Sequence, residues 1–302
     1  MAPSDDHAPP TRYIERTHAW YAALGYPQPY RYAQFAEVPF TRLSLPLAQA
    51  RIALITTAAP YRPELGDQSA RAPYNAAAKF HAVYSGDTAH DHDLRVSHVS
   101  VDRAHLGDDA NCWFPLPALR RAAASGRIGA VAARFHGVPT TYSQRQTLQV
   151  DAPEALARCR EDGADAAILV ANCPVCHQTL SLTARTMEAA GLPTVLMGAA
   201  KDIVELCGVP RFLFSDVPLG SAAGLANDEA SQDATLDLAL SLLAQAPGPR
   251  TTVHNPLRWP GPPGWRADFM NLAGPSAEDL ARERARNDEA RAVALGVRST
   301  IY

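Results

Sequence analysis

Residues 164–197, ADAAILVANCPVCHQTLSLTARTMEAAGLPTVLM, contain the pattern that decides the fold. DAAILVA (165–171) is an apolar run of strand length, and HQTLSLTARTMEAAG (177–191) is typical of a helix that stops at a glycine. PTVLM (193–197) is a second apolar run of strand length. A buried strand, a helix and another buried strand in this order favour a unit whose two strands lie parallel.

The same alternation extends over most of the chain and predicts the fold class. We expect an α/β fold with a doubly wound, mainly parallel sheet, as in flavodoxin-like or racemase-like lobes. The predicted strands are 51–59, 94–102, 128–137, 165–171, 193–197 and 211–216. The predicted helices are 116–126, 152–163, 177–191, 200–208 and 228–246.

The two ends of the chain differ from this central part. Residues 1–50 include HAWYAALGYPQPYRYAQFAEVPF (18–40), which predicts a helix and then an aromatic arm that packs on the body or covers a cleft. Residues 247–302 are proline-rich at first and then form a charged helix, and we expect them to wrap the body or contact another subunit. The α/β domain, in one or two lobes, is therefore assigned to residues 51–246.

The composition excludes several classes of protein. With 47% hydrophobic and 20% charged residues and a formal net charge of -3, the chain is typical of a globular protein that binds neither nucleic acid nor an anionic membrane. No apolar run is long enough to span a membrane, and MAPSDDHAPP (1–10) lacks the apolar segment of a signal peptide. Five cysteines, an odd number, indicate a cytoplasmic protein whose thiols have individual roles.

Cys173 and Cys176 are the main candidates for chemistry. They follow strand 165–171, and ligands of open α/β sheets bind beyond the carboxyl ends of the strands. A thiol at the N-terminus of a helix has a lowered pKa, and the Cys-x-x-Cys spacing allows a disulfide. We interpret Cys173 as the exposed nucleophile and Cys176 as the resolving thiol, with His177 to donate a proton or to stabilise the thiolate.

Two other interpretations of the pair stay open. A zinc site normally needs a second pair of ligands, and Cys112, Cys159 and Cys207 are isolated from one another, so no metal is assigned. The other interpretation is that the two thiols are buried in the core and take part in no reaction.

Residues 89–115 are rich in histidine and aspartate and supply further candidates. We expect the strand-end residues to face the same cleft as the cysteines, whereas the HDHD run (90–93) is interpreted as a solvated loop. The candidate catalytic residues beside the two cysteines and His177 are His98 and Asp102. The candidate substrate-binding residues are Thr56, Thr57, Ser97, Asn111, His136, Gln178 and Thr179.

Several of these stretches resemble the selenoprotein B subunit family of glycine, sarcosine, betaine and D-proline reductases. The resemblance is carried by RVSHVSVD (95–102), DANCWFPLPALRRA (109–122), GRIGAVA (126–132) and the Cys-x-x-Cys that follows the later strand. It covers about two thirds of the chain, from residue 51 to near residue 240.

The resemblance implies a thiol-dependent reductase acting on a small molecule. In that family a Sec-x-x-Cys couple occupies this position and the selenolate attacks the substrate or a substrate adduct. Cys173 matches the selenocysteine and Cys176 its partner, so this sequence departs from the family by having sulfur in place of selenium. The resemblance implies no organic cofactor bound to this chain, a pyruvoyl group on a partner subunit, and an external dithiol donor such as a thioredoxin.

Two further functions stay open. A racemase- or lyase-like enzyme would use one cysteine as acid and base, but it needs a thiol across the cleft, and TTAAPY (56–61) contains none. The other possibility is a metal-binding or structural subunit of a larger complex, or a homo-oligomer. In that case residues 247–302 would contact the other subunit.

Overall fold

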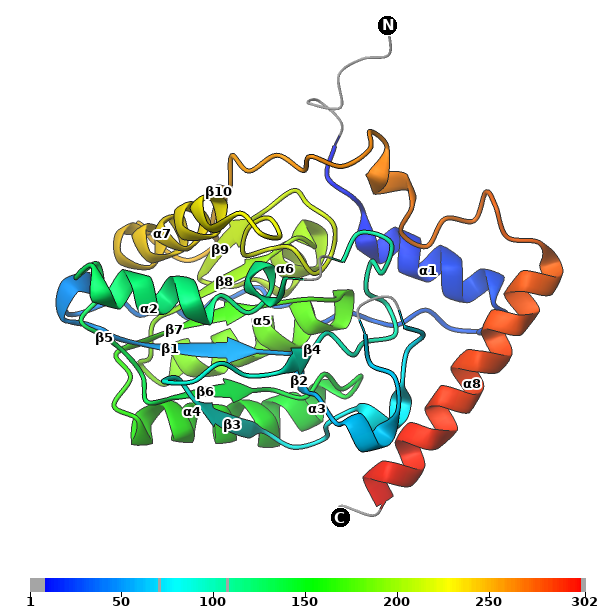
Figure 1. The fold of residues 1–302 in the computed structure, drawn as a ribbon, viewed down its shortest axis with the longest axis horizontal. Coiled ribbons are helices and arrows are strands. Elements are labelled where there is room, and N and C mark those ends of the chain that lie inside the picture. Colours follow the sequence, from blue (N-terminus) through cyan, green and yellow to red (C-terminus); the bar gives the residue numbers. More distant parts are fainter. Residues whose placement is uncertain (1–8, 70–71, 107–108, 300–302) are drawn as a thin grey trace, which may run out of the picture.

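The computed structural model describes residues 9–69, 72–106 and 109–299. Its main sheet has the strand order β10-β9-β8-β7-β1-β6-β3, with the short β5 also paired to β1 (Figure 1). Every pairing in this sheet is parallel except that of β3 with β6. The strands are β1 (Arg51–Thr56), β2 (Ala59–Pro60), β3 (Tyr84–Asp87), β4 (Leu94–Arg95), β5 (Ala130–Val131), β6 (Arg134–Gly137), β7 (Ala166–Val170), β8 (Thr194–Gly198), β9 (Arg211–Phe214) and β10 (Thr251–His254).

Helices connect these strands and cover the sheet. The α-helices are α1 (Tyr13–Ala23), α2 (Leu116–Ala124), α3 (Gln144–Gln146), α4 (Ala152–Glu161), α5 (Pro174–Ala189), α6 (Lys201–Cys207), α7 (Glu229–Gln245) and α8 (Ala277–Ser299). The short helical turns are η2 (Leu47–Gln49), η3 (Pro63–Leu65), η4 (Ala76–Ala78), η5 (Ala110–Cys112), the π-helical η6 (Thr147–Asp151) and η7 (Trp265–Ala267).

Both faces of the central strands are apolar because helices cover both. Ile52 and Leu54 of β1 belong to one core cluster, which includes residues of α2 and α7. Ala53 and Ile55 point the other way and join a second cluster with residues of α4, α5 and α6. Successive side chains of a strand alternate between faces, so a strand buried on both sides is a continuous apolar run. The predicted doubly wound, mainly parallel α/β fold is confirmed.

The strand predicted at 94–102 is wrong for most of its length. β4 covers Leu94–Arg95 and pairs with β2 in a separate two-stranded sheet, and residues 96–102 have no regular secondary structure. Burial nevertheless alternates from residue 94 to residue 100. The period-two pattern therefore reports alternate burial of a chain lying on the protein body, which does not require a strand partner.

Other boundaries also differ from the prediction. The run 128–137 divides into β5 and β6, and β3 and β10 were not expected. β10 pairs in parallel with β9, so the sheet continues past residue 246. A charged helix was expected near the C-terminus, and α8 confirms it.

The reversal of the winding direction lies between β1 and β7. These two strands are adjacent and parallel. The chain leaves β1 toward β6, on one side, whereas it leaves β7 toward β8, on the other. The loops that follow the two strands therefore diverge, and ligands of open α/β sheets bind in the space that such a divergence leaves.

The first and the last α-helix lie beside this edge of the sheet (Figure 1). Figure 1 shows β1 pointing toward the side of the molecule where α1 and α8 lie. The two helices are tied together where α1 ends: Arg284 Nη1 donates to the Leu24 carbonyl at 2.9 Å, and the Tyr26 hydroxyl donates to Asp288 at 2.9 Å. Across the described ranges, no helix is both long enough and apolar enough to cross a membrane.

A buried ion pair joins α5, β9 and the N-terminal arm. Arg211 Nη1 lies 2.7 Å from Glu188 Oε1, and their side chains are 1% and 0% exposed. Thr41 of the arm donates its backbone N–H to Glu188 and accepts a hydrogen bond from Arg211 at 2.7 Å. A buried charge is tolerated because its partner and its hydrogen bonds replace water.

Removing one member of this pair is expected to destabilise the fold strongly. Glu188→Ala leaves the Arg211 guanidinium buried without its counter-charge, which should lower the free energy of unfolding by about 3–5 kcal/mol. The control is Glu278→Ala, which removes an 81% exposed carboxylate paired with Arg282 on α8 and should cost at most about 1 kcal/mol. Urea unfolding measures both, and equal losses in the two variants would contradict the assignment.

Candidate active site

Two cysteines lie at the N-terminus of α5, a few residues after β7 ends. Cys173 is the residue before the first helical turn, Pro174 occupies its first position, and the Cys173 backbone is extended (φ -137°, ψ 168°). Proline suits this position because its missing N–H would have no partner in the helix. The Cys173 sulfur accepts the Cys176 N–H at 3.2 Å, as a serine or aspartate oxygen does in other helices.

Cys173 and Cys176 are joined by a disulfide, with their Cα atoms 4.9 Å apart. Their residues are 3% and 0% exposed, so the expected difference in exposure between nucleophile and resolving thiol is small in this state. Thr140, in the loop after β6, places its hydroxyl oxygen 3.5 Å from the Cys176 sulfur. The disulfide closes within one helical turn, as the spacing allows.

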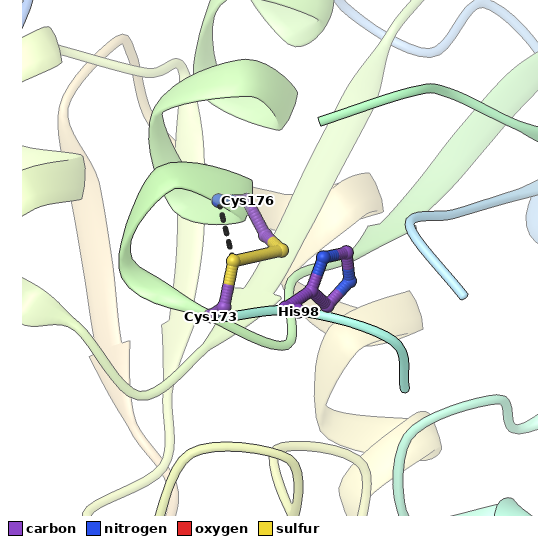
Figure 2. A group of neighbouring side chains, drawn as sticks. All are labelled: His98, Cys173 and Cys176. Carbon is purple, nitrogen blue, oxygen red and sulfur yellow. Dashed lines mark hydrogen bonds between the residues drawn. A yellow bond between two sulfur atoms is a disulfide. The ribbon is translucent and has the colours of Figure 1, made fainter. Parts of the chain in front are cut away.

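His98 is the histidine that the fold brings to the sulfurs. Its ring and the two sulfurs lie together in Figure 2, and one ligand atom from each residue lies within 4.8 Å of the others. His98 is 7% exposed, and its Nε2 has no hydrogen-bond partner among the described residues. Arg103 donates to the His98 carbonyl at 2.7 Å, which holds this part of the irregular segment 96–102 in place.

Burial keeps the His98 ring neutral. Desolvation lowers the pKa of His98 to about 3, the positive charges of Lys79 and Arg103 lower it further, and a hydrogen bond with the Thr57 backbone opposes them. A neutral imidazole with a free nitrogen is able to accept a proton from a neighbouring thiol. The thiolate that results would stabilise the protonated ring, because opposite charges favour one another in a dry site.

The loops after β1 and β7 meet beside these residues. Asn172 precedes Cys173, and its side-chain amide donates to the Thr57 hydroxyl at 3.4 Å. The Thr56 hydroxyl instead accepts the Ala58 N–H at 3.0 Å, which turns the chain at the end of β1. All three side chains are fully buried, and Asn172 Oδ1 is a buried acceptor without a hydrogen-bond partner in the described residues.

His177 has contacts that differ from its expected role. One ring nitrogen, Nδ1, lies 2.7 Å from the Cys173 carbonyl, and Nε2 accepts the N–H groups of Ala199 and Ala200 at 2.9 and 3.1 Å. Burial lowers the pKa of His177 to about 4, so the ring is neutral. Since both nitrogens are held by backbone groups, His177 joins the starts of α5 and α6 and has no nitrogen left for a thiolate.

The ring of His177 also explains a glycine. A Cβ atom added at Gly198, where β8 ends, would lie 2.5 Å from His177 Nε2. Contacts this short do not occur in folded proteins, so the histidine and the glycine are required together.

Gln178 and Thr179 have different surroundings from those expected of substrate ligands. Gln178 Oε1 accepts the Ala33 N–H of the N-terminal arm at 2.7 Å, and its amide nitrogen donates to the Tyr30 hydroxyl. Gln178 therefore holds the arm against α5. Thr179 is buried and its hydroxyl has no partner among the described residues, and nothing connects it with the sulfurs.

Asp102 and His136 lie among other groups. The pKa of Asp102 is raised by burial, and the charges that act on it are His105 and Asp268. His136, on β6, lies 2.9 Å from the Ser85 hydroxyl and 3.2 Å from Asp162. Neither residue belongs to the group of ligand atoms that lie within 4.8 Å of one another around the cysteines, and their roles at the site stay a prediction.

The remaining candidates are Ser97 and Asn111. Ser97 is half-buried next to His98, and no contact of its side chain links it to the sulfurs. Asn111 lies in η5, where its N–H donates to Asp109 at 3.0 Å.

The residues near the sulfurs that the sequence analysis did not identify are Thr140 and Asn172. Both follow strands of the sheet at its carboxyl edge, which is the signal that identifies them in retrospect.

The N-terminal arm closes a small cavity over the start of α5. The cavity has a volume of about 20 Å³, which is room for one water molecule. Tyrosines of the arm and Tyr142 face the first turn of α5 across it. Its lining consists of Thr17, His18, Tyr21, Tyr30, Tyr32, Ser100, Tyr142, Pro174 and Val175. In this conformation the cavity does not admit an amino-acid-sized molecule.

Comparison with known proteins agrees with the resemblance seen in the sequence. The chain is 29% identical over 222 residues to the gamma subunit of D-proline reductase from Acetoanaerobium sticklandii. The match covers 73% of this chain and 89% of that subunit. No protein-family model matches the chain, and no solved structure does either. The suspected similarity to reductase subunits is confirmed, and it supports a reductase-related role.

The neutral state of His177 predicts a pH-dependent stability. An unfolded histidine takes up a proton near pH 6.5, whereas His177 in the folded chain does so at about pH 4. The unfolded state therefore binds more protons between these values, and stability falls as the pH falls through this window. Between pH 7 and pH 5 the loss through this group is about 2 kcal/mol.

Urea unfolding at the two pH values measures this loss in the wild type and in His177→Gln. The variant lacks the titrating ring, so its pH-dependent loss should be smaller by about that amount. A variant whose stability falls as steeply as that of the wild type would show that His177 titrates normally in the folded chain.

Proposed function

We propose that this chain is the thiol-bearing component of a reductase that cleaves a bond of a small substrate. Cys173 is the nucleophile, Cys176 resolves the adduct, and His98 accepts the proton of the attacking thiol. The observation that carries the proposal is the Cys173–Cys176 pair at a helix N-terminus, with a ring nitrogen of the buried His98 within 4.8 Å of both sulfurs. The similarity to a D-proline reductase subunit supports the same class of reaction.

The proposed reaction has two steps. The Cys173 thiol gives its proton to His98, and the thiolate attacks a substrate carbon while the bond to the leaving group breaks and that group takes up a proton. The Cys176 thiolate then attacks the Cys173 sulfur, the carbon–sulfur bond breaks, and the carbon takes up a proton. The substrate gains two electrons and the two sulfurs lose two as their disulfide forms.

The protein environment favours Cys173 as the attacking group. Its sulfur lies at the N-terminus of α5, where the helix dipole and the Cys176 N–H stabilise a negative charge. Cys176 lies within the first turn of the helix, where its sulfur is within reach of Cys173. A small external dithiol protein, such as a thioredoxin, would reduce the disulfide after each turnover.

The relative is named as one subunit of D-proline reductase, and this suggests both a substrate class and a partner. We infer that the substrate is a small amine such as a cyclic α-amino acid, activated by a carbonyl group on a partner subunit. The departure from selenium to sulfur makes that activation more important, because a thiol is less ionised than a selenol at neutral pH.

The roles of the two cysteines are testable by trapping. With D-proline, a pyruvoyl-bearing partner subunit and a dithiol, Cys173→Ser should lose turnover completely. Cys176→Ser should accumulate a substrate adduct on Cys173, detected by peptide mass spectrometry. His98→Gln should lower turnover by about 100-fold, since it removes the proton acceptor.

Cys112→Ser is the matched control, because Cys112 is also buried but is a free thiol in another part of the fold. It should leave turnover and the linkage between Cys173 and Cys176 unchanged. Absence of that linkage after mild oxidation of the wild type, or turnover by Cys173→Ser, would overturn the proposal.

A further inference from the structure

His98, Cys173 and Cys176 bring three metal-binding atoms to one place. One donor atom of each residue lies within 4.8 Å of the other two, and all three residues are buried (Figure 2). In a tetrahedral zinc site, with bonds of about 2.3 Å to sulfur, neighbouring ligand atoms are about 3.8 Å apart. Once the disulfide is reduced, the sulfurs need to separate only to this distance, and a ring nitrogen of His98 already lies within 4.8 Å of both.

His98 is buried beside the two sulfurs, with one ring nitrogen within 4.8 Å of both. Its Nε2 is buried on a residue that is 7% exposed and has no hydrogen-bond partner in the described residues. A buried polar nitrogen without a partner carries a cost in free energy, which a bound ion would remove.

The cysteine spacing also suits a metal. Two cysteines separated by two residues are a common half of zinc sites, since one turn of chain places both sulfurs on one ion. The Cys176 N–H that reaches the Cys173 sulfur at 3.2 Å would stabilise a metal-bound thiolate in the same way that it stabilises a free one.

We propose that the reduced chain binds one Zn²⁺ ion through Cys173, Cys176 and His98. Two thiolates and an imidazole are a ligand set that selects zinc, and three protein ligands leave the fourth position for water or a substrate atom. Binding releases two protons, one from each thiol, and involves no electron transfer. This goes beyond the proposed function, because it assigns a second state to the same sulfurs.

Zinc binding and the disulfide exclude one another, since both use the same two sulfur atoms. Zinc therefore protects the reduced pair from oxidation and withholds it from a substrate. In the oxidised chain the two sulfurs are bonded to each other, so this zinc site is lost. A chain that alternates between the two states would release zinc on oxidation.

Zinc titration of the whole chain tests this inference without any substrate. Reduced protein, kept under a thiol-free reductant, competes with a chromophoric chelator for Zn²⁺, and elemental analysis gives the stoichiometry. We expect one zinc per reduced chain and none per oxidised chain. Cobalt(II) in place of zinc should give the intense absorption bands of a tetrahedral site with thiolate ligands.

Variants identify the ligands. Cys173→Ser and Cys176→Ser should abolish stoichiometric binding, and His98→Gln should weaken it by about 100-fold or more, since replacing even a residue behind a ligand costs 10–100-fold. Cys112→Ser, which changes a buried thiol outside the cluster, should bind zinc as the wild type does. Circular dichroism establishes that each variant is folded.

Two results would overturn the inference. One is a reduced wild-type chain that binds less than one zinc or gives no tetrahedral cobalt spectrum, which needs no variant to fold. The other is unweakened binding by folded His98→Gln. Turnover is measured separately, so a chain that reduces its substrate but binds no zinc would refute the zinc site and leave the proposed function standing.

Discussion

The hydrogen bond from the Cys176 N–H to the Cys173 sulfur depends on how α5 follows β7. Three residues separate the end of β7 from the start of α5, with Cys173 before the first turn of the helix and Pro174 in it. That turn lies at the edge where the chain leaves β1 and β7 in opposite directions. The parallel sheet thus supplies the location, and the unpaired N–H groups of the helix start supply the positive end of a dipole for sulfur.

Burial of this edge of the sheet, away from water, determines the charge of its two histidines. His98 and His177 are both buried and both neutral, but they differ in their free nitrogens. His177 has both ring nitrogens held by backbone groups and serves the fold. His98 keeps one nitrogen without a partner in the described residues and faces the sulfurs. The proposed proton transfer and the proposed zinc site both depend on this difference between the two histidines.

The N-terminal arm joins the site through α5 itself. Gln178, two residues after Cys176, accepts the Ala33 N–H, and the arm tyrosines close the small cavity above Pro174. The buried pair of Arg211 and Glu188 fixes the arm again at Thr41. Anchors on both sides hold the arm against the helix that carries the cysteines, so the structure shows the site in a closed form.

Local patterns were sufficient for the class of fold and for the cysteine pair. Apolar runs and the residues that stop helices depend on neighbours in the chain, so strands β7 and β8 and helices α5 and α7 were predicted within a few residues. The position of Cys173 and Cys176 followed from the strand before them. Contacts between distant segments were not predictable, because an alternating pattern shows which side chains are buried but not what they pack against. The pattern is the same in a strand and in a loop that lies on the protein body. The three-dimensional fold therefore separated His98, which lies beside the sulfurs, from His177, whose two ring nitrogens are held by backbone groups.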